Sequence, residues 1–372
     1  MRKTLLSSLA LFILAIACNN PTVAPRPTIP LVHAIVADTA GLGRLVASAG
    51  HQGVSGSIAL IGEPDEVIAL ARRFQTVDQA DNIDGSARRD SLPDFAGEHF
   101  DAILDANDAP YTHYLQLPAG LDASADSLRE TAVRNALFAW DSTCFASASH
   151  LKPGLRKPQA KILIFTSSLQ ARWGLFDVDT LQQLCGGSSR LLSPTRIMLE
   201  DALEAGARNL AVWTSREVRL AGSWEAVFQD LAPEGATLQV LSPDGALDVR
   251  TDFRQLLRQY RANASRLDAL LLDSYALDPA PLLSELSLIR LDGTEEDASF
   301  NKMIAPDLCI LDPASSAIRA TYRLLRRESL FSHRIARPLI RYYETAESGQ
   351  GSPVLVEVDA SYIHRAYVQD FD

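Results

Sequence analysis

The sequence lacks the short motifs that mark several common classes of enzyme. There is no GxxxxGK[ST] phosphate loop, so the segment Asp38-Thr39-Ala40-Gly41, which resembles a GTPase switch, has no phosphate site to serve. There is no GxSxG turn of the kind that presents the serine of α/β-hydrolases. The SxxK segment at residues 149–152 lacks the SDN and KTG partners of penicillin-interacting enzymes. These absences favour a protein that is not an enzyme.

Cysteine is also scarce, with 4 residues in a chain of 372. No CxxC pair and no His/Cys cluster has the spacing of a zinc site, so we expect neither a metal nor a cofactor. If Cys18 is modified as described below, Cys144, Cys185 and Cys309 remain. An odd number allows at most one disulfide within a monomer, and we expect free thiols.

Positive charge is in short supply. The chain has 35 Lys+Arg against 46 Asp+Glu, a formal net charge of -11, which disfavours binding to nucleic acid because that requires neutralised phosphates. A local cluster of arginines is the exception. We interpret it as a helix face paired with the chain's own carboxylates, the alternative being a docking site for an anionic partner. Its members are Arg319, Arg323, Arg326, Arg327, Arg334, Arg337 and Arg341.

The N-terminus has the layout of a secretory signal. Arg2 and Lys3 precede an apolar run at residues 5–17 that is too short to span a bilayer, and Cys18 follows. Because Ala15-Ile16-Ala17-Cys18 resembles a lipobox, we expect a signal peptide at residues 1–17 and a lipid on Cys18. Proline-rich residues 18–30 would then form a tether. The expected location is the cell envelope, periplasm-facing, with the outer membrane favoured and the lipid as the sole membrane attachment.

Short apolar runs alternate with amphipathic stretches along the rest of the chain. Continuous apolar runs are typical of parallel strands covered on both faces, and strand-helix alternation indicates βαβ units. We therefore predict an α/β fold with mainly parallel sheets. The predicted strands are residues 31–39, 57–62, 100–105, 111–117, 161–166, 209–214, 237–241, 267–273, 307–312 and 353–358. Ser193 and Pro194 predict a helix start, and Gly206 a helix end.

From residue 193 onward, the order of elements resembles a known family. LEDALEAGARNLAVWTS reads as a helix ending at glycine and a strand, LDALLLDSY as a strand with a polar end, and SAIRATYRLLRRESLF as a late helix. This order is similar to the second lobe of type 1 periplasmic binding proteins, which share their fold with LacI-like sugar sensors. The resemblance implies two Rossmann-like lobes, at residues 31–192 and 193–335, and a return segment at 336–372.

In such sheets, ligands bind beyond the carboxyl ends of the strands. The resemblance therefore implies a small polar ligand, for example a sugar-like molecule, that is bound as the two lobes close, and a transporter or sensor as the partner. The first alternative is an envelope assembly protein that binds protein or glycan. The second is an enzyme that acts on envelope carbohydrate or peptide, which no motif supports. The expected ligand-binding residues follow the predicted strands: Asp38, Thr39, Asn107, Asp108, Ser167, Ser168, Trp213, Ser215, Arg216, Asp273, Ser274 and Tyr275.

Overall fold

The computed structural model describes residues 27–368, except for 83–84, 117–120, 150, 152–154, 244–247, 261–265, 333, 335 and 350. The expected signal peptide, the lipidation site Cys18 and most of the tether lie outside these residues, so the anchor and the envelope location stay predictions. Within the described ranges, no helix combines the length and the apolar character needed to cross a membrane.

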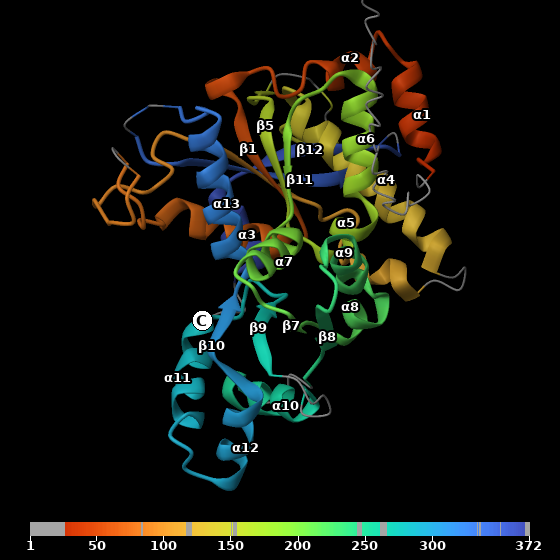
Figure 1. Ribbon diagram of the computed structural model, residues 1–372. Coiled ribbons are helices and arrows are strands. Elements are labelled where there is room, and N and C mark those ends of the chain that lie inside the picture. The colour runs from red at the N-terminus through yellow and green to blue at the C-terminus, as the bar shows by residue number, and fades with distance from the viewer. Residues whose placement is uncertain are drawn as a thin grey trace, which may run out of the picture.

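A six-stranded sheet forms the larger lobe (Figure 1). Its strand order is β12-β11-β2-β1-β5-β6, and all neighbours are parallel except β11 and β12. The two strands at the end of the chain thus complete a sheet begun near its start. The strands are β1 (Ser57–Gly62), β2 (His99–Leu104), β5 (Ala160–Phe165), β6 (Arg190–Leu192), β11 (Leu339–Glu347) and β12 (Pro353–Val358).

Helices cover both faces of this sheet, which explains why its central strands are apolar throughout. Along β1, Ala59 and Ile61 pack with α1, α4 and α6, while Ile58 and Leu60 pack with α3 and α13 on the other face. The elements of this lobe are α1 (Pro30–Ala37), α2 (Leu42–Ala47), η1 (Gly53–Ser55), α3 (Pro64–Thr76), η2 (Tyr111–Gln116), α4 (Leu121–Trp140), the short strands β3 (Thr143–Cys144) and β4 (Leu155–Arg156), α5 (Ser168–Trp173), α6 (Leu175–Cys185), α13 (Pro313–Arg327) and α14 (Ala360–Tyr367).

A four-stranded parallel sheet of order β10-β9-β7-β8 forms the second lobe, at the lower end of Figure 1. In β7, Leu210 and Val212 pack with α7 and α9, and Ala211 packs with α10, α11 and α12. The elements are α7 (Pro194–Glu204), β7 (Asn209–Trp213), α8 (Arg216–Ala221), α9 (Ser223–Leu231), β8 (Thr237–Leu241), α10 (Val249–Tyr260), β9 (Leu267–Leu272), α11 (Pro279–Ile289), α12 (Glu295–Met303) and β10 (Ile304–Leu311).

The predicted mixed α/β class, with mainly parallel sheets in two lobes, is confirmed, but two predicted strands are wrong and one strand was missed. Residues 31–39 form helix α1 and its end instead of a strand, and residues 111–116 form the 3₁₀ helix η2. The strand β11 was not expected from the sequence. Ser193 precedes α7 as predicted, yet its hydroxyl makes no capping hydrogen bond. The described cysteines Cys144, Cys185 and Cys309 are free thiols, as expected.

The arginine cluster is largely tied to carboxylates of the same chain. Arg319 and Arg323 of α13 both pair with Asp201 of α7, at 3.3 and 3.0 Å. Arg341 pairs with Glu357 across the β11–β12 ladder at 2.6 Å. These contacts agree with the interpretation of a self-paired helix face.

Candidate active site

The carboxyl ends of the two sheets meet, and side chains from one lobe bind groups of the other. The Ser168 hydroxyl, at the start of α5, donates to Asp273 Oδ2 at 3.0 Å. The Tyr275 hydroxyl donates to the Thr166 carbonyl oxygen at 3.3 Å. Asp273 and Tyr275 follow β9 of the second sheet, whereas Thr166 and Ser168 follow β5 of the first. The junction therefore brings two strand ends into one polar site.

Asp273 is the carboxylate at the centre of this junction. Its Oδ2 accepts three hydrogen bonds, from Ser168 Oγ, from Thr214 Oγ1 at 2.7 Å and from Trp224 Nε1 at 2.8 Å. Its Oδ1 accepts none from the residues that the structure describes. Burial raises the pKa of Asp273, while the three donors act in the opposite direction. One oxygen is thus fixed by donors from both lobes, and the other is left for a bound molecule.

Glu66 lies in the first turn of α3, directly after β1. Its Oε2 accepts one hydrogen bond, from Thr166 Oγ1 at 2.7 Å. Burial, then the charges of Glu63 and Asp273, raise the pKa of Glu66 well above its usual value. Glu66 therefore keeps its proton to a higher pH than an ordinary glutamate does.

Glycine at position 62 leaves room for the hydrogen bond between Thr166 and Glu66, since a Cβ there would lie 1.9 Å from Thr166 Oγ1.

A buried polar network supports the first-lobe side of the site. Asp105, at the end of β2, accepts hydrogen bonds from the Tyr111 hydroxyl at 2.8 Å, from Asn135 Nδ2 at 2.6 Å and from Thr345 Oγ1 at 2.9 Å. The backbone N–H of Tyr111 in turn donates to Glu63 Oε1 at 3.0 Å. Burial raises the pKa of both carboxyl groups, Asp105 and Glu63. The network orders η2 and Glu63 beside the strand ends.

Two cavities share Asp273 and Ser274. The larger, of about 1100 Å³, lies beyond the ends of β7, β8 and β9, and its wall includes Trp213 and Arg216. The smaller, of about 360 Å³, lies between the lobes and is lined by Asp65, Glu66, Ile68, Ala69, Arg72, Asp273, Ser274, Tyr275, Ala276, Tyr367 and Val368. The volume of the smaller cavity is in the range of small-molecule sites, and that of the larger is slightly above it. The smaller one places Glu66 and Asp273, from different lobes, around one space.

Most of the residues expected from the sequence gather at this junction. The structure brings together Ser168, Trp213, Ser215, Arg216, Asp273, Ser274 and Tyr275. Ser167 lies beside them as the N-cap of α5, where its hydroxyl accepts from the Leu169 N–H. Whether these residues bind a ligand stays a prediction.

Four expected residues have other roles. Asp38 caps the turn before α2 through the N–H groups of Gly41 and Leu42, and Thr39 follows it there, because the predicted strand is a helix. Asn107 donates its backbone N–H to Thr345 Oγ1. Asp108 is held by Tyr114 and Arg134, at 2.9 Å each. These contacts order loops of the first lobe.

Glu63, Glu66 and Trp224 were not expected from the sequence. The signal for the two glutamates was present, since they follow a continuous apolar strand as the other candidates do. However, a proline at the first helical position and acidic residues in the first turn are also typical of an ordinary helix start. Trp224 lies in α9 and does not directly follow a strand. Nothing in the sequence therefore indicates that its indole contacts Asp273, which comes 49 residues later.

Of the comparisons with known proteins, the one with solved structures found similar proteins. No protein-family model matches the chain, and no curated protein does. The chain is similar to a glutamate racemase from Francisella tularensis, at 14% identity and a TM-score of 0.48 over 80% of this chain and 90% of that one. A glutamate racemase from Bacillus anthracis gives 14% and 0.48 over 82% and 98%. Arylmalonate decarboxylase gives 15% and 0.34 over 72% and 92%.

These neighbours correct the predictions that depended on the family resemblance. They are racemases and a decarboxylase, so the resemblance to type 1 periplasmic binding proteins is wrong. Solute binding by lobe closure, and the alternative of an envelope assembly lipoprotein, are wrong with it. The expectation that the chain is not an enzyme is contradicted too, since these neighbours are racemases and a decarboxylase. At such low identity and TM-score, the reaction of this chain has to be inferred from its own site.

Proposed function

We propose that the chain is an enzyme that moves protons to and from a small polar molecule, with Asp273 as the base and Glu66 as the acid. One observation carries this proposal: the two carboxyl groups line the same cavity of about 360 Å³, but their hydrogen-bond environments differ. Carboxyl groups whose surroundings favour different protonation states are the usual means of acid-base catalysis near neutral pH.

The roles follow from the contacts of each group. Three donors on Oδ2 favour the charged form of Asp273 and fix its orientation, which leaves Oδ1 to accept a proton. Glu66 has one donor, from Thr166, and lies close to other carboxylates, so its neutral form is favoured. Arg72 lines the same cavity and offers a cation for a carboxylate of the bound molecule.

The simplest reaction of this pair is an isomerisation at a carbon next to a carboxyl group. Asp273 takes the proton of the C–H bond, and the electron pair is delocalised onto the neighbouring carboxyl. Glu66 then gives its proton to the other face of the carbon, so one C–H bond breaks and one forms. Exchange with water returns both groups to their starting states.

Hydrogen exchange in D₂O tests this proposal. Two of the structural neighbours are glutamate racemases, so glutamate is the first compound to test as a substrate, followed by other amino, hydroxy and keto acids. We expect the full chain to replace the proton next to the carboxyl group with deuterium, as followed by proton NMR. Asp273→Asn and Glu66→Gln should each lower the rate by about 10²- to 10⁴-fold, the usual contribution of a general acid or base.

Asp38→Asn is the matched control, because Asp38 is exposed and caps a turn away from the cavity. Its exchange rate should equal that of the natural chain. Exchange that survives both active-site substitutions would remove Asp273 and Glu66 from the reaction. A chain that exchanges none of these acids would contradict the proposal as a whole.

A further inference from the structure

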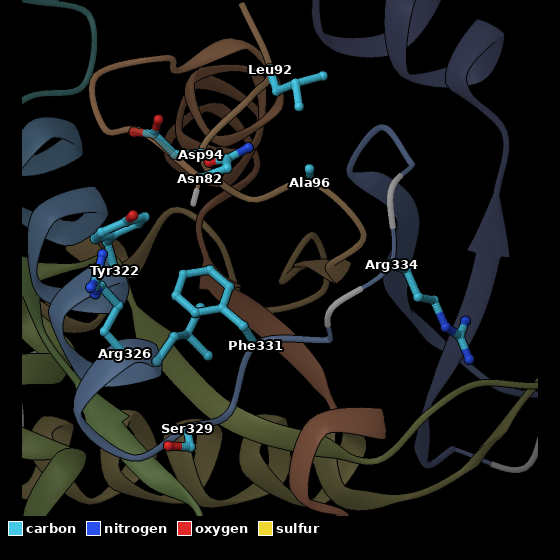
Figure 2. A pocket seen from close by; sticks show the side chains of 10 residues that line it. Asn82, Leu92, Asp94, Ala96, Tyr322, Arg326, Ser329, Phe331 and Arg334 are labelled. Carbon is cyan, nitrogen blue, oxygen red and sulfur yellow. The ribbon is translucent and has the colours of Figure 1, made fainter. Parts of the chain in front are cut away.

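A third cavity, of about 440 Å³, lies on the first lobe and shares no lining residue with the two cavities of the candidate active site. It is formed between the segment that follows α3 and the C-terminal end of α13 (Figure 2). Asn82, Leu92 and Asp94 line it from the first segment, and Tyr322 and Phe331 line it from the second. Its size suits a small organic molecule.

Aromatic rings fix one wall of this cavity. Tyr322 and Phe331 meet edge to face, with ring centroids 5.3 Å apart. The buried ring of Phe95 supports both, at 6.1 Å from Tyr322 and 6.5 Å from Phe331, and is itself packed against Phe74 at 4.9 Å. Because each ring is held by its neighbours, the wall is already formed before any ligand binds.

Asp94 supplies a buried carboxylate with one oxygen left over. The residue is 5% exposed, and its Oδ1 accepts the backbone N–H groups of Gln79 and Ala80 at 2.9 and 3.0 Å. Its Oδ2 accepts no hydrogen bond from the described part of the chain. Burial raises the pKa of Asp94, while the two backbone donors of Gln79 and Ala80 act in the opposite direction. A buried carboxylate in this state gains from a cation that donates a hydrogen bond.

The two arginines in the wall leave this need unmet. Arg326 packs over Tyr322, with its Cζ 6.0 Å from the ring centroid, and reaches Gly85 on the opposite segment. The side chain of Arg334 points away from the rings in Figure 2. Within the described part of the chain, the contacts of the Asp94 carboxylate are the two backbone N–H groups on Oδ1, and no ion pair includes it. The charge of Asp94 is therefore not neutralised within the cavity.

We propose that this cavity is a second binding site, for a primary amine joined to an apolar or aromatic group. The ammonium group donates to Asp94 Oδ2, and the apolar group lies against Tyr322 and Phe331. Aromatic rings attract an ammonium as well as an apolar group, so both parts of the ligand contribute.

Calorimetric titration of the full chain with phenethylamine, which combines the two features, tests the proposal. We expect phenethylamine to bind saturably. We expect 2-phenylethanol, which has the ring and lacks the charge, to bind about tenfold more weakly than phenethylamine. Asp94→Asn should weaken phenethylamine binding by about tenfold or more, since the amide keeps the acceptor for Gln79 and Ala80 but loses the charge. Asp230→Asn, an exposed charge loss on α9, should leave binding unchanged.

Three results would overturn the proposal: no saturable binding of phenethylamine, equal binding of 2-phenylethanol, or equal binding to Asp94→Asn and the natural chain. If Asp94→Asn fails to fold, as judged by circular dichroism, Phe331→Leu decides the question. That substitution removes one ring of the wall and should weaken binding by about fivefold. Unchanged binding to Phe331→Leu would then reject the site.

Discussion

The two ends of the first sheet bury carboxyl groups in opposite ways. At the amino end, Glu98 of the strand entry is 1% exposed and binds Lys161 Nζ at 2.8 Å, and Asp101 binds Lys157 at 3.5 Å. At the carboxyl end, Glu66 and Asp105 have hydrogen-bond donors but no cation among the described ion pairs. Removing one partner of a buried ion pair leaves an uncompensated charge and lowers stability, whereas a buried carboxyl group without a counter-ion is available for chemistry.

The amino end should give the largest loss of stability. Lys161 also donates to the carbonyl oxygens of Val54 and Leu330, at 3.3 and 2.7 Å, so it ties three segments to the strand. Lys161→Met leaves Glu98 buried and unpaired, and we expect the free energy of unfolding in urea to fall by about 3 to 5 kcal/mol. Arg196→Met, which removes a half-exposed partner of Glu200, should cost less than about 1 kcal/mol. Equal losses of stability in Lys161→Met and Arg196→Met would show that the buried pair at the amino end matters no more than an exposed pair.

The carboxyl end should respond to pH with a definite sign. Burial and the charges of Glu63 and Asp273 raise the pKa of Glu66 in the folded chain above its value in the unfolded chain. The protonated group therefore stabilises the fold below its ordinary pKa, and this contribution is lost as pH rises through the folded pKa. Glu66→Gln cannot ionise, so it should be more stable than the natural chain at pH 8, by about 1 kcal/mol, with a smaller difference at pH 5.

Urea unfolding at both pH values measures this difference. Glu204→Gln, at an exposed position of α7, is the control and should show no dependence on pH of its own. A Glu66→Gln variant that is less stable than the natural chain at pH 8 would show that Glu66 is held in its charged form, as the paired carboxylates are.

The smallest expected effect is at the contact between the lobes. Ser168→Ala removes one of the three donors to Asp273, and that donor lowers the pKa of the carboxyl. The pKa of Asp273 should therefore rise, which moves the acidic limb of the hydrogen-exchange rate to higher pH. We expect stability to fall by about 1 kcal/mol. Ser284→Ala, at an exposed hydroxyl on α11, should change neither the acidic limb nor the stability. If the acidic limb of Ser168→Ala stays where it is in the natural chain, Asp273 is not the base of the reaction.

The sequence was sufficient for the strands whose side chains are buried on both faces. The continuous apolar run of β1 predicts a central parallel strand, and all six of its residues are buried. The run at residues 31–37 is also mostly apolar but forms a helix that buries Val32 and Ile35, because periodicity alone does not separate a short apolar helix from a strand. Pro30, at the first position of α1, was the available sign.

The candidate site was predictable in its residue types and not in its contacts. The rule that polar residues follow parallel strands located Ser168 and Asp273, which lie 105 residues apart and meet at 3.0 Å. Local sequence does not state which strand ends face each other, so it could not pair Glu66 with Asp273. The type 1 binding-protein resemblance failed for the same reason: it rested on the order of elements, which many α/β folds share.

The place of β11 has a consequence for synthesis on the ribosome. Thr345 of β11 donates to Asp105, 240 residues earlier in the chain, and β11 pairs with β2 along its length. All four strands of the second sheet lie between these two partners. The nascent chain therefore exposes one edge of β2 until β11 has emerged, while the second lobe already has every strand of its sheet.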